Sequence, residues 1–204
     1  MNRREAIQQV AWLMGGAISA PAILGVLSGC SPKQLAASWK PVFLSEAQGA
    51  LVAEVAEIMI PRTDTPGAKD VGVPAFIDLM LKDAYTKDDQ ERFISGLQSF
   101  DDAAKQAHGS GFMKLDAPQR LALIQKVHDA AAREERALVP PPSTIRRPFI
   151  LMTKELSLLG FFTSQAGATQ VLQYVAVPGA LHACIPVSAA GNGKSWALET
   201  STRF

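Results

Sequence analysis

The chain has 204 residues, of which 48% are hydrophobic and 19% are charged, and its formal net charge is +1. This length predicts one globular domain with room for a hydrophobic core, because domains commonly span about 100–200 residues. The near-neutral charge argues against a nucleic-acid partner, which would favour a basic face on the protein.

The first thirty residues have the features of an export signal rather than of a folded domain. Arg3 and Arg4 form a charged pair, and a mildly apolar stretch rich in alanine and glycine follows from Val10 to Leu27. Paired arginines before such a stretch are typical of a bacterial twin-arginine (Tat) signal, although only Ile7 supplies a bulky apolar residue just after the pair. An ordinary secretory signal or a membrane anchor is the alternative.

The end of this segment predicts a lipid anchor. Leu27-Ser28-Gly29-Cys30 resembles a lipobox, the small-residue run before a cysteine that is lipidated after cleavage. We therefore expect a cleavable signal over residues 1–30, lipidation of Cys30, and a location on the periplasmic side of the bacterial membrane. Removing the signal leaves equal numbers of basic and acidic residues, so the mature chain is close to neutral.

The remaining sequence predicts a small, orthogonal all-α domain of about five helices. Residues 31–44 form a polar tether, and a single domain follows over residues 45–204, with a long irregular C-terminal arm from residue 160. Capping and proline signals place the helices. The first runs from a capping box at Ser45 and Gln48 to Pro61, and the second begins at Pro74. The others span about 88–107, 116–136, where Asp116 with Gln119 caps the start, and 148–162, with a short helix near 169–174.

Apolar residues at helical spacing predict the buried face of each helix. In chain order these are Leu51, Val52, Val55, Ile58 and Met59; Ile77, Met80, Leu81 and Ala84; Phe93, Leu97, Phe100 and Ala104; Leu121, Ile124, Val127 and His128; and Phe149, Ile150, Leu156 and Leu159. The last helix is not a membrane span, because Lys154 and Glu155 lie in its middle.

The segment Ile58–Asp78 joins the first two helices through three prolines and two glycines. It contains no nucleophile–base pair and no phosphate-binding loop, and such ordered loops often carry binding surfaces. We expect Asp64 to cap a turn. The carboxylates Glu54 and Glu57 beside the first helix stripe, and Asp64, Asp70 and Asp78 in the loop, are expected to hold the loop rather than to catalyse. Arg62 is expected to pair within the loop or with a partner protein.

Histidine and cysteine patterns predict no metal or haem site. No two of His108, His128 and His182 share a metal-ligand spacing, and we expect a partly buried His128 and an exposed His108. The two cysteines, Cys30 and Cys184, form no CxxC, haem or iron–sulfur motif. If Cys30 is lipidated, Cys184 can form an intermolecular disulfide in an oxidising compartment; a buried free thiol is the favoured alternative.

Sequence motifs that bind nucleotide cofactors are also missing. Gly191–Ser195 resembles the end of a phosphate loop, but Ser188 stands where the first glycine is required, and no G-x-G-x-x-G occurs. We therefore expect no cofactor in this chain. The late aromatic residues Phe161, Phe162 and Tyr174 are candidates for a partner interface, since exposed aromatics anchor interfaces.

Three parts of the sequence together resemble the gluconate 2-dehydrogenase subunit 3 family. They are the paired-arginine start, AEIMIPRTDTPGAKDVGVPAFID at residues 56–78, and GFFTSQAGATQVLQYVAVPG at residues 160–179. Cys184-Ile185-Pro186 and Gly193–Ala197 fit the same tail pattern. The middle of the chain, about residues 85–142, is generic helix.

This resemblance implies an accessory subunit of a membrane-bound sugar or polyol dehydrogenase. In such complexes an FAD-dependent large subunit of the glucose–methanol–choline (GMC) type oxidises the substrate, and a multihaem cytochrome c subunit takes the electrons. The small subunit carries the Tat signal and is thought to escort the folded flavoprotein through the Tat translocase. The resemblance thus implies a chaperone-like subunit that is not itself an enzyme.

The sequence is compatible with two other functions. The chain could be a free-standing periplasmic lipoprotein that binds a small molecule or the cell envelope, with a concave pocket bounded by the loop and the tail. An enzyme in its own right is the third hypothesis, and it would need scattered residues such as Asp64, His182 and Lys194 to meet in the fold.

Overall fold

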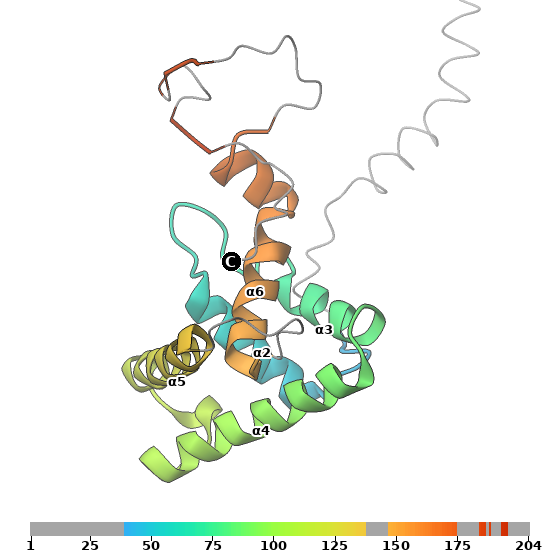
Figure 1. Cartoon of the computed structure of the whole chain (residues 1–204), viewed down its shortest axis with the longest axis vertical. Helices are drawn as coiled ribbons and strands as arrows, with labels where there is room; N and C mark the ends of the chain where they lie inside the picture. Colours follow the sequence, from blue (N-terminus) through green and yellow to red (C-terminus); the bar gives the residue numbers. More distant parts are fainter. Residues whose placement is uncertain (1–38, 138–146, 175–183, 187, 189–192, 196–204) are drawn as a thin grey trace, which may run out of the picture. The chain divides into compact units, whose positions relative to one another are not determined.

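Five α-helices make up most of the described structure (Figure 1). The computed structural model describes residues 39–137, 147–174, 184–186, 188 and 193–195. The α-helices are α2 (Glu46–Met59), α3 (Val73–Asp83), α4 (Lys87–His108), α5 (Ala117–Ala137) and α6 (Phe149–Phe162), with a 3-10 turn η2 (Phe112–Lys114) and a π-helical turn η3 (Gly167–Val171). These ranges contain no extended strand, so the predicted all-α class is confirmed.

Local capping explains where two of the helices begin. The Ser45 hydroxyl accepts a hydrogen bond from the Gln48 N–H (3.3 Å), and the Gln48 side chain accepts one from the Ser45 N–H (2.9 Å). Asp116 and Gln119 make the same reciprocal pair before α5, at 2.8 and 3.3 Å. Each pair satisfies backbone donors that a helix end would otherwise leave free, and both sequence predictions are confirmed.

Helix α6 is the central element of the core. It contacts α2, α3, α4 and α5, and Figure 1 shows it as the orange helix that runs across the direction of α4. A helix that is apolar on nearly all sides is typical of such a buried position. Its buried residues are Phe149, Ile150, Leu151, Met152, Thr153, Leu156, Ser157, Gly160 and Phe161.

The predicted buried faces are confirmed for most positions and wrong for three. Leu121 is 45% exposed and Leu159 is 37% exposed, and Ala84 also lies at the surface. Helix α5 buries Leu123 and Ile124 instead. Among the described helices, α5 packs mainly on α6, so its core face is narrower than the spacing of its apolar residues suggests.

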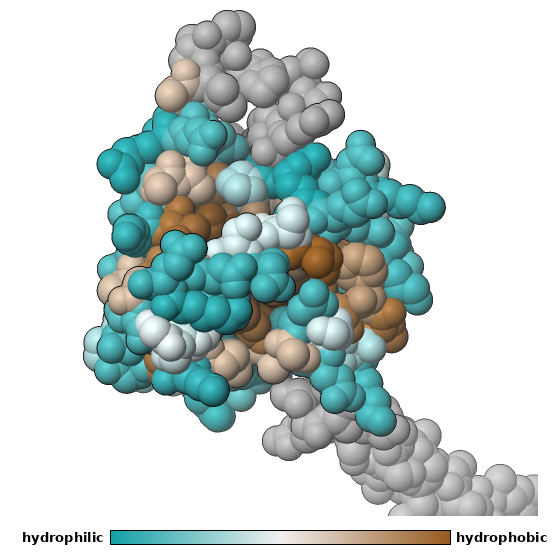
Figure 2. Space-filling view, turned by 90° about the horizontal axis from the view of Figure 1, so that it is seen from below, coloured by the Kyte–Doolittle hydropathy of each residue, from teal (hydrophilic) through white to brown (hydrophobic). Residues whose placement is uncertain are grey.

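Hydrophilic side chains cover much of the face of the domain seen from below in Figure 2. Figure 2 shows apolar side chains visible between hydrophilic ones on the face seen from below. Among the described residues, no helix is both long enough and apolar enough to cross a bilayer.

The start of α6 fits closely against α4 at Gly96. A Cβ at Gly96 would lie 2.6 Å from the Cβ of Phe149, and the Phe149 ring packs against Phe93 and Phe100 with centroids 5.0 and 5.7 Å apart. The absence of a side chain at residue 96 therefore lets the two helices approach.

We expect Gly96→Ala to lower the free energy of unfolding by about 1 kcal/mol. The methyl group would force α6 away from α4 at a cost of about 1–3 kcal/mol, which exceeds the helix-propensity gain of up to about 1 kcal/mol. Urea unfolding followed by circular dichroism measures the change. Ser99→Ala, on an exposed turn of the same helix, is the control; equal or greater stability of Gly96→Ala would contradict the close packing.

The N-terminus of α4 contains an acid-sensitive contact. The Thr86 hydroxyl (2.7 Å) and then the Arg92 guanidinium (2.5 Å) donate hydrogen bonds to Asp89, and together they lower the pKa of Asp89 below its ordinary value of 3.8. Because the folded pKa is lowered, this stabilisation is present above the ordinary pKa and is lost as the pH falls through the folded pKa.

We expect Asp89→Asn to reduce stability by about 0.3 kcal/mol at neutral pH, a small value because the group is solvent-screened. The difference from the unmodified chain should shrink as the pH falls below about 4. Thermal unfolding at a series of pH values checks this. Asp88→Asn, at the neighbouring exposed position, is the control, and a difference that stays constant down to pH 2 would contradict the prediction.

The C-terminal part differs from the expected short helix. The turn η3 spans Gly167–Val171, two residues earlier than predicted, and is π-helical. Beyond it, the Gln173 N–H donates to the Ser195 carbonyl at 2.8 Å, and the Lys194 ammonium donates to the Gln170 carbonyl at 2.7 Å. These contacts link the described parts of the C-terminal arm.

Candidate functional site: the loop between α2 and α3

The loop at residues 60–72 is held against α2 by Glu57. One carboxylate oxygen of Glu57 accepts from the Arg62 N–H (3.3 Å) and the other from the Lys69 N–H (2.8 Å). The Ala68 N–H closes the loop by donating to the Ile60 carbonyl at 3.0 Å. A Cβ at Gly67 would collide with the Glu57 carboxylate, so a residue without a side chain is required where the loop crosses the helix.

Two further carboxylates complete the support of the loop. Asp70 accepts from the Gly67 N–H at 3.0 Å and pairs with the Arg62 guanidinium at 3.4 Å. Glu54 pairs with Lys69 and, at 3.2 Å, with Arg120 of α5. The expectation that carboxylates hold this loop is confirmed for Glu54, Glu57 and Asp70 but not for Asp64 and Asp78. Of the two alternatives for Arg62, the ion pair within the loop is present.

The tip of the loop is exposed. Pro61, Arg62, Thr63 and Asp64 all lie at the surface, and the Thr63 N–H donates to the Thr65 carbonyl at 3.0 Å. The prediction that Asp64 caps this turn is wrong, because the turn is closed by the two threonines and Asp64 has no hydrogen bond within the described part of the chain. Its carboxylate is therefore free to meet a partner.

Asp78 anchors the entry of the chain into the domain. It is fully buried, and its carboxylate accepts hydrogen bonds from the N–H groups of Val42 (2.7 Å), Phe43 (3.2 Å) and Leu44 (2.8 Å). It belongs to α3 rather than to the loop. The sequence did not predict that Asp78 binds the amides of residues 42–44. Its position next to Ile77, on the apolar face of the helix, was the available signal, because a buried carboxylate needs hydrogen-bond donors.

The aromatic candidates are divided between core and surface. Phe161 is buried (3% exposed), and its ring meets that of the half-buried Phe162 edge-on, with centroids 5.4 Å apart. Tyr174 is 58% exposed. Of the three, Tyr174 therefore offers the most surface to a partner, and Phe161 serves the core.

The cysteine and histidine candidates differ in their exposure. Cys184 is exposed, so the favoured alternative of a buried thiol is wrong; its disulfide to another chain stays a prediction. His128 is partly buried and His108 is exposed, as expected. Arg3, Arg4, Cys30 and His182 lie outside the described residues.

The chemistry of the loop is structural. Apart from Asp64, its charged groups pair with one another or with the glutamates of α2. No group of three or more His, Cys, Asp or Glu side chains within the described residues is arranged to hold a metal ion. What the loop presents outward is a positioned tip with one cationic and one anionic side chain.

A scan of protein-family models matches the gluconate 2-dehydrogenase subunit 3 model to residues 46–179. This range is about two thirds of the chain and includes the 60–72 loop, Asp78 and all five described α-helices. The chain belongs to the gluconate 2-dehydrogenase subunit 3 family. Searches of curated proteins and of solved structures gave no match.

As a gluconate 2-dehydrogenase subunit 3, the chain is a subunit of a dehydrogenase complex of that type and associates with the other subunits of the complex. The resemblance noted from residues 56–78 and 160–179 is thereby confirmed. Family membership is also consistent with an accessory role in a membrane-associated complex.

We expect Glu57→Ala to lower the free energy of unfolding by about 1–2 kcal/mol, because two backbone N–H groups lose a charged acceptor. Hydrogen exchange at the amides of Arg62 and Lys69 should accelerate far more than exchange in α4. Glu91→Ala is the control, since Glu91 is exposed and has no partner in the described structure. Unchanged exchange at both loop amides would show that Glu57 does not hold the loop.

Proposed function

We propose that this gluconate 2-dehydrogenase subunit 3 is a non-catalytic subunit that escorts the folded, FAD-containing large subunit through the Tat pathway and supports its assembly. The observation that carries the proposal is the loop at residues 60–72, which is held by two hydrogen bonds to Glu57 while its tip is exposed. Family membership and the paired arginines Arg3 and Arg4 support it.

A pre-organised loop suits recognition of a folded partner. Binding costs free energy for every side chain and loop that must be ordered at the interface, and here the backbone is already fixed by hydrogen bonds to Glu57 and Asp70. Arginine and tyrosine are enriched among residues that dominate interface energies. We therefore assign Arg62, Asp64 and Tyr174 to the proposed interface with the large subunit.

We infer the remaining parts of the complex from the resemblance to the family. The FAD belongs to the GMC-type large subunit and haem c to a multihaem cytochrome subunit, so substrate oxidation and electron transfer take place in the partner chains. Lipidation of Cys30 would anchor the subunit on the periplasmic side of the membrane.

Co-purification tests the proposed function. The full-length chain with a C-terminal tag, extracted in mild detergent from its own cells, should recover a protein with an FAD absorbance spectrum. The double variant Arg62→Glu, Asp64→Arg should recover much less of it. Arg136→Glu is the control, since Arg136 is exposed at the far end of α5. Recovery of the chain alone, or no difference between the two variants, would count against the proposal.

A further inference from the structure

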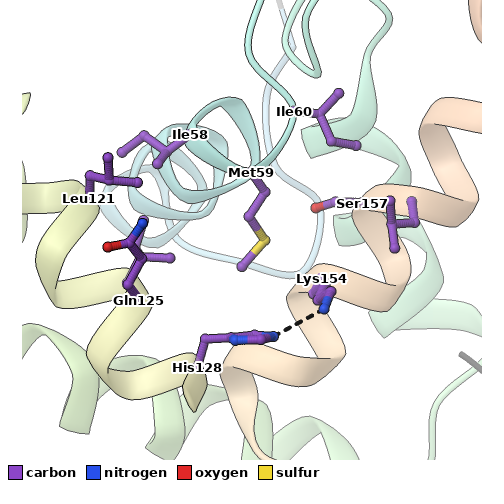
Figure 3. Close-up of a pocket in the computed structure, with 10 residues that line it drawn as sticks. Ile58, Met59, Ile60, Leu121, Gln125, His128, Lys154 and Ser157 are labelled. Atoms are coloured by element: carbon purple, nitrogen blue, oxygen red, sulfur yellow. Dashed lines mark hydrogen bonds between the residues drawn. The ribbon is translucent and has the colours of Figure 1, made fainter. Parts of the chain in front are cut away.

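A cavity of about 210 Å³ lies between the end of α2 and the facing sides of α5 and α6 (Figure 3). It differs from the pocket expected between the loop and the tail, because two long helices form most of its wall. The lining residues are Ile58, Met59, Ile60, Leu121, Ile124, Gln125, His128, Lys154, Ser157 and Leu158. Most of this wall is apolar, and the polar groups come from α5 and α6.

One polar group in the wall has no partner. Ser157 is fully buried, and its hydroxyl makes no hydrogen bond within the described residues. Thr153, one turn earlier in α6, satisfies its own hydroxyl by donating to the Phe149 carbonyl at 2.8 Å. A buried hydroxyl without a partner costs free energy. Because Ser157 is one of the residues that line the cavity, a bound molecule is the candidate for its missing partner.

A cation is held beside the same cavity. Lys154 and His128 are linked in Figure 3, with 3.0 Å between the Lys154 Nζ and His128 Nε2 atoms. His128 Nδ1 lies 3.1 Å from the Asp129 carboxylate. Both contacts are satisfied when the imidazole is neutral and carries its proton on Nδ1. His128 is then a positioning residue, and the Lys154 ammonium keeps two N–H donors for another acceptor.

These features together select one class of ligand. Lys154 and Ser157 are three residues apart and therefore lie on the same face of α6, so a single carboxylate can meet a cation and a hydroxyl donor there. The apolar wall suits a hydrocarbon body, and the volume exceeds the roughly 150 Å³ of an engineered cavity that binds benzene. A ligand cation would be repelled by Lys154, and a dianion would find only this one cation in the lining.

We propose that this cavity binds a small monocarboxylate of about six carbons, whose hydrocarbon part forms an apolar body. Its carboxylate pairs with Lys154 and accepts a hydrogen bond from Ser157, and its hydrocarbon part packs against Met59 and Ile124. This site is separate from the exposed tip of the 60–72 loop, and it does not depend on the proposed escort function.

Titration of the ¹⁵N-labelled full-length chain with hexanoate, followed by NMR, tests the proposal. A ligand of this size should bind with a dissociation constant on the order of 1 mM, with shifts concentrated at residues 121–128 and 154–158. Hexan-1-ol and hexylamine match the body but not the head group, and acetate matches only the head group. All three should bind about tenfold more weakly or not at all.

Three variants distinguish binding in this cavity from non-specific charge attraction and from changes in stability. Lys154→Met should weaken hexanoate binding by about tenfold and leave hexan-1-ol unaffected. Lys126→Met, at an exposed lysine of α5 outside the cavity, should change neither. Ser157→Ala should raise the Tm of the free chain, because an unpaired buried hydroxyl is removed, and should also weaken hexanoate binding; a purely structural serine would change only the Tm.

Several outcomes would overturn the proposal. Equal affinity for hexanoate and hexan-1-ol would show a merely apolar cavity, and equal loss in Lys154→Met and Lys126→Met would show non-specific charge attraction. If hexanoate does not bind but Lys154→Met weakens recovery of the flavoprotein, the cavity is a docking surface for that partner rather than a small-molecule site.

Discussion

Replacing Asp78 by alanine is expected to lower the free energy of unfolding by about 3 kcal/mol. The substitution leaves the N–H groups of Val42, Phe43 and Leu44 without their shared acceptor, and hydrogen bonds to a charged group contribute about 1.5–3 kcal/mol each. The expected loss of about 3 kcal/mol is smaller than the sum for three such hydrogen bonds. Val42 is 60% exposed, so water can replace the carboxylate as the acceptor for its N–H group. Urea unfolding monitored by circular dichroism measures the loss.

Two further variants identify the cause of the Asp78 effect. Asp78→Asn keeps one acceptor oxygen but turns an amide N–H₂ toward a backbone donor, so its cost should be intermediate. Asp83→Ala removes an exposed carboxylate from the same helix and should change stability by less than about 0.5 kcal/mol. If Asp78→Ala costs no more than Asp83→Ala, the three hydrogen bonds do not hold the entry segment.

Replacing Arg3 and Arg4 together by lysine is expected to reduce the periplasmic amount of both this subunit and the flavoprotein to background. Lysine keeps the positive charge but lacks the planar, bidentate guanidinium of arginine. A receptor that reads the arginine pair should therefore reject the variant, whereas an ordinary secretory signal, which requires only a positively charged start, should tolerate it. Both proteins should disappear from the periplasm together, because in the proposed escort function the flavoprotein has no export route of its own.

Cell fractionation with immunoblots against both proteins measures the effect. Lys33→Arg, which alters a basic residue beyond Cys30 and keeps its charge, is the control and should leave export unchanged. If the flavoprotein still reaches the periplasm while this subunit stays in the cytoplasm, the escort function is wrong. If both proteins are exported normally, the signal is not of the twin-arginine type.

The two halves of the proposed role rest on different parts of the chain. Export rests on residues 1–30, which lie outside the described structure, whereas partner binding rests on the 60–72 loop. The loop variants and the arginine variants therefore fail independently. A loop variant should be exported without its partner, and an arginine variant should bind its partner in the cytoplasm.

Helix positions were predictable from the sequence because their signals are local. The capping pair Ser45–Gln48 acts over three residues, and Pro74 acts within the first turn of α3. The family was recognisable for a similar reason, since the motifs at residues 56–78 and 160–179 are contiguous stretches. The structural role of Glu54, Glu57 and Asp70 was also predictable, because no base or nucleophile accompanies them in the sequence.

Only the tertiary structure decided which groups meet across the fold. Asp78 lies 34 to 36 residues from the amides that it holds, and Glu54 lies 66 residues from Arg120; no spacing rule connects such pairs. Leu121 was expected in the core because it lies at helical spacing from the other apolar residues. In the structure it is 45% exposed and lines the cavity between α2, α5 and α6. The cavity itself combines α2, α5 and α6, so the unpaired Ser157 hydroxyl and the Lys154 ammonium share a site only after these three helices have packed.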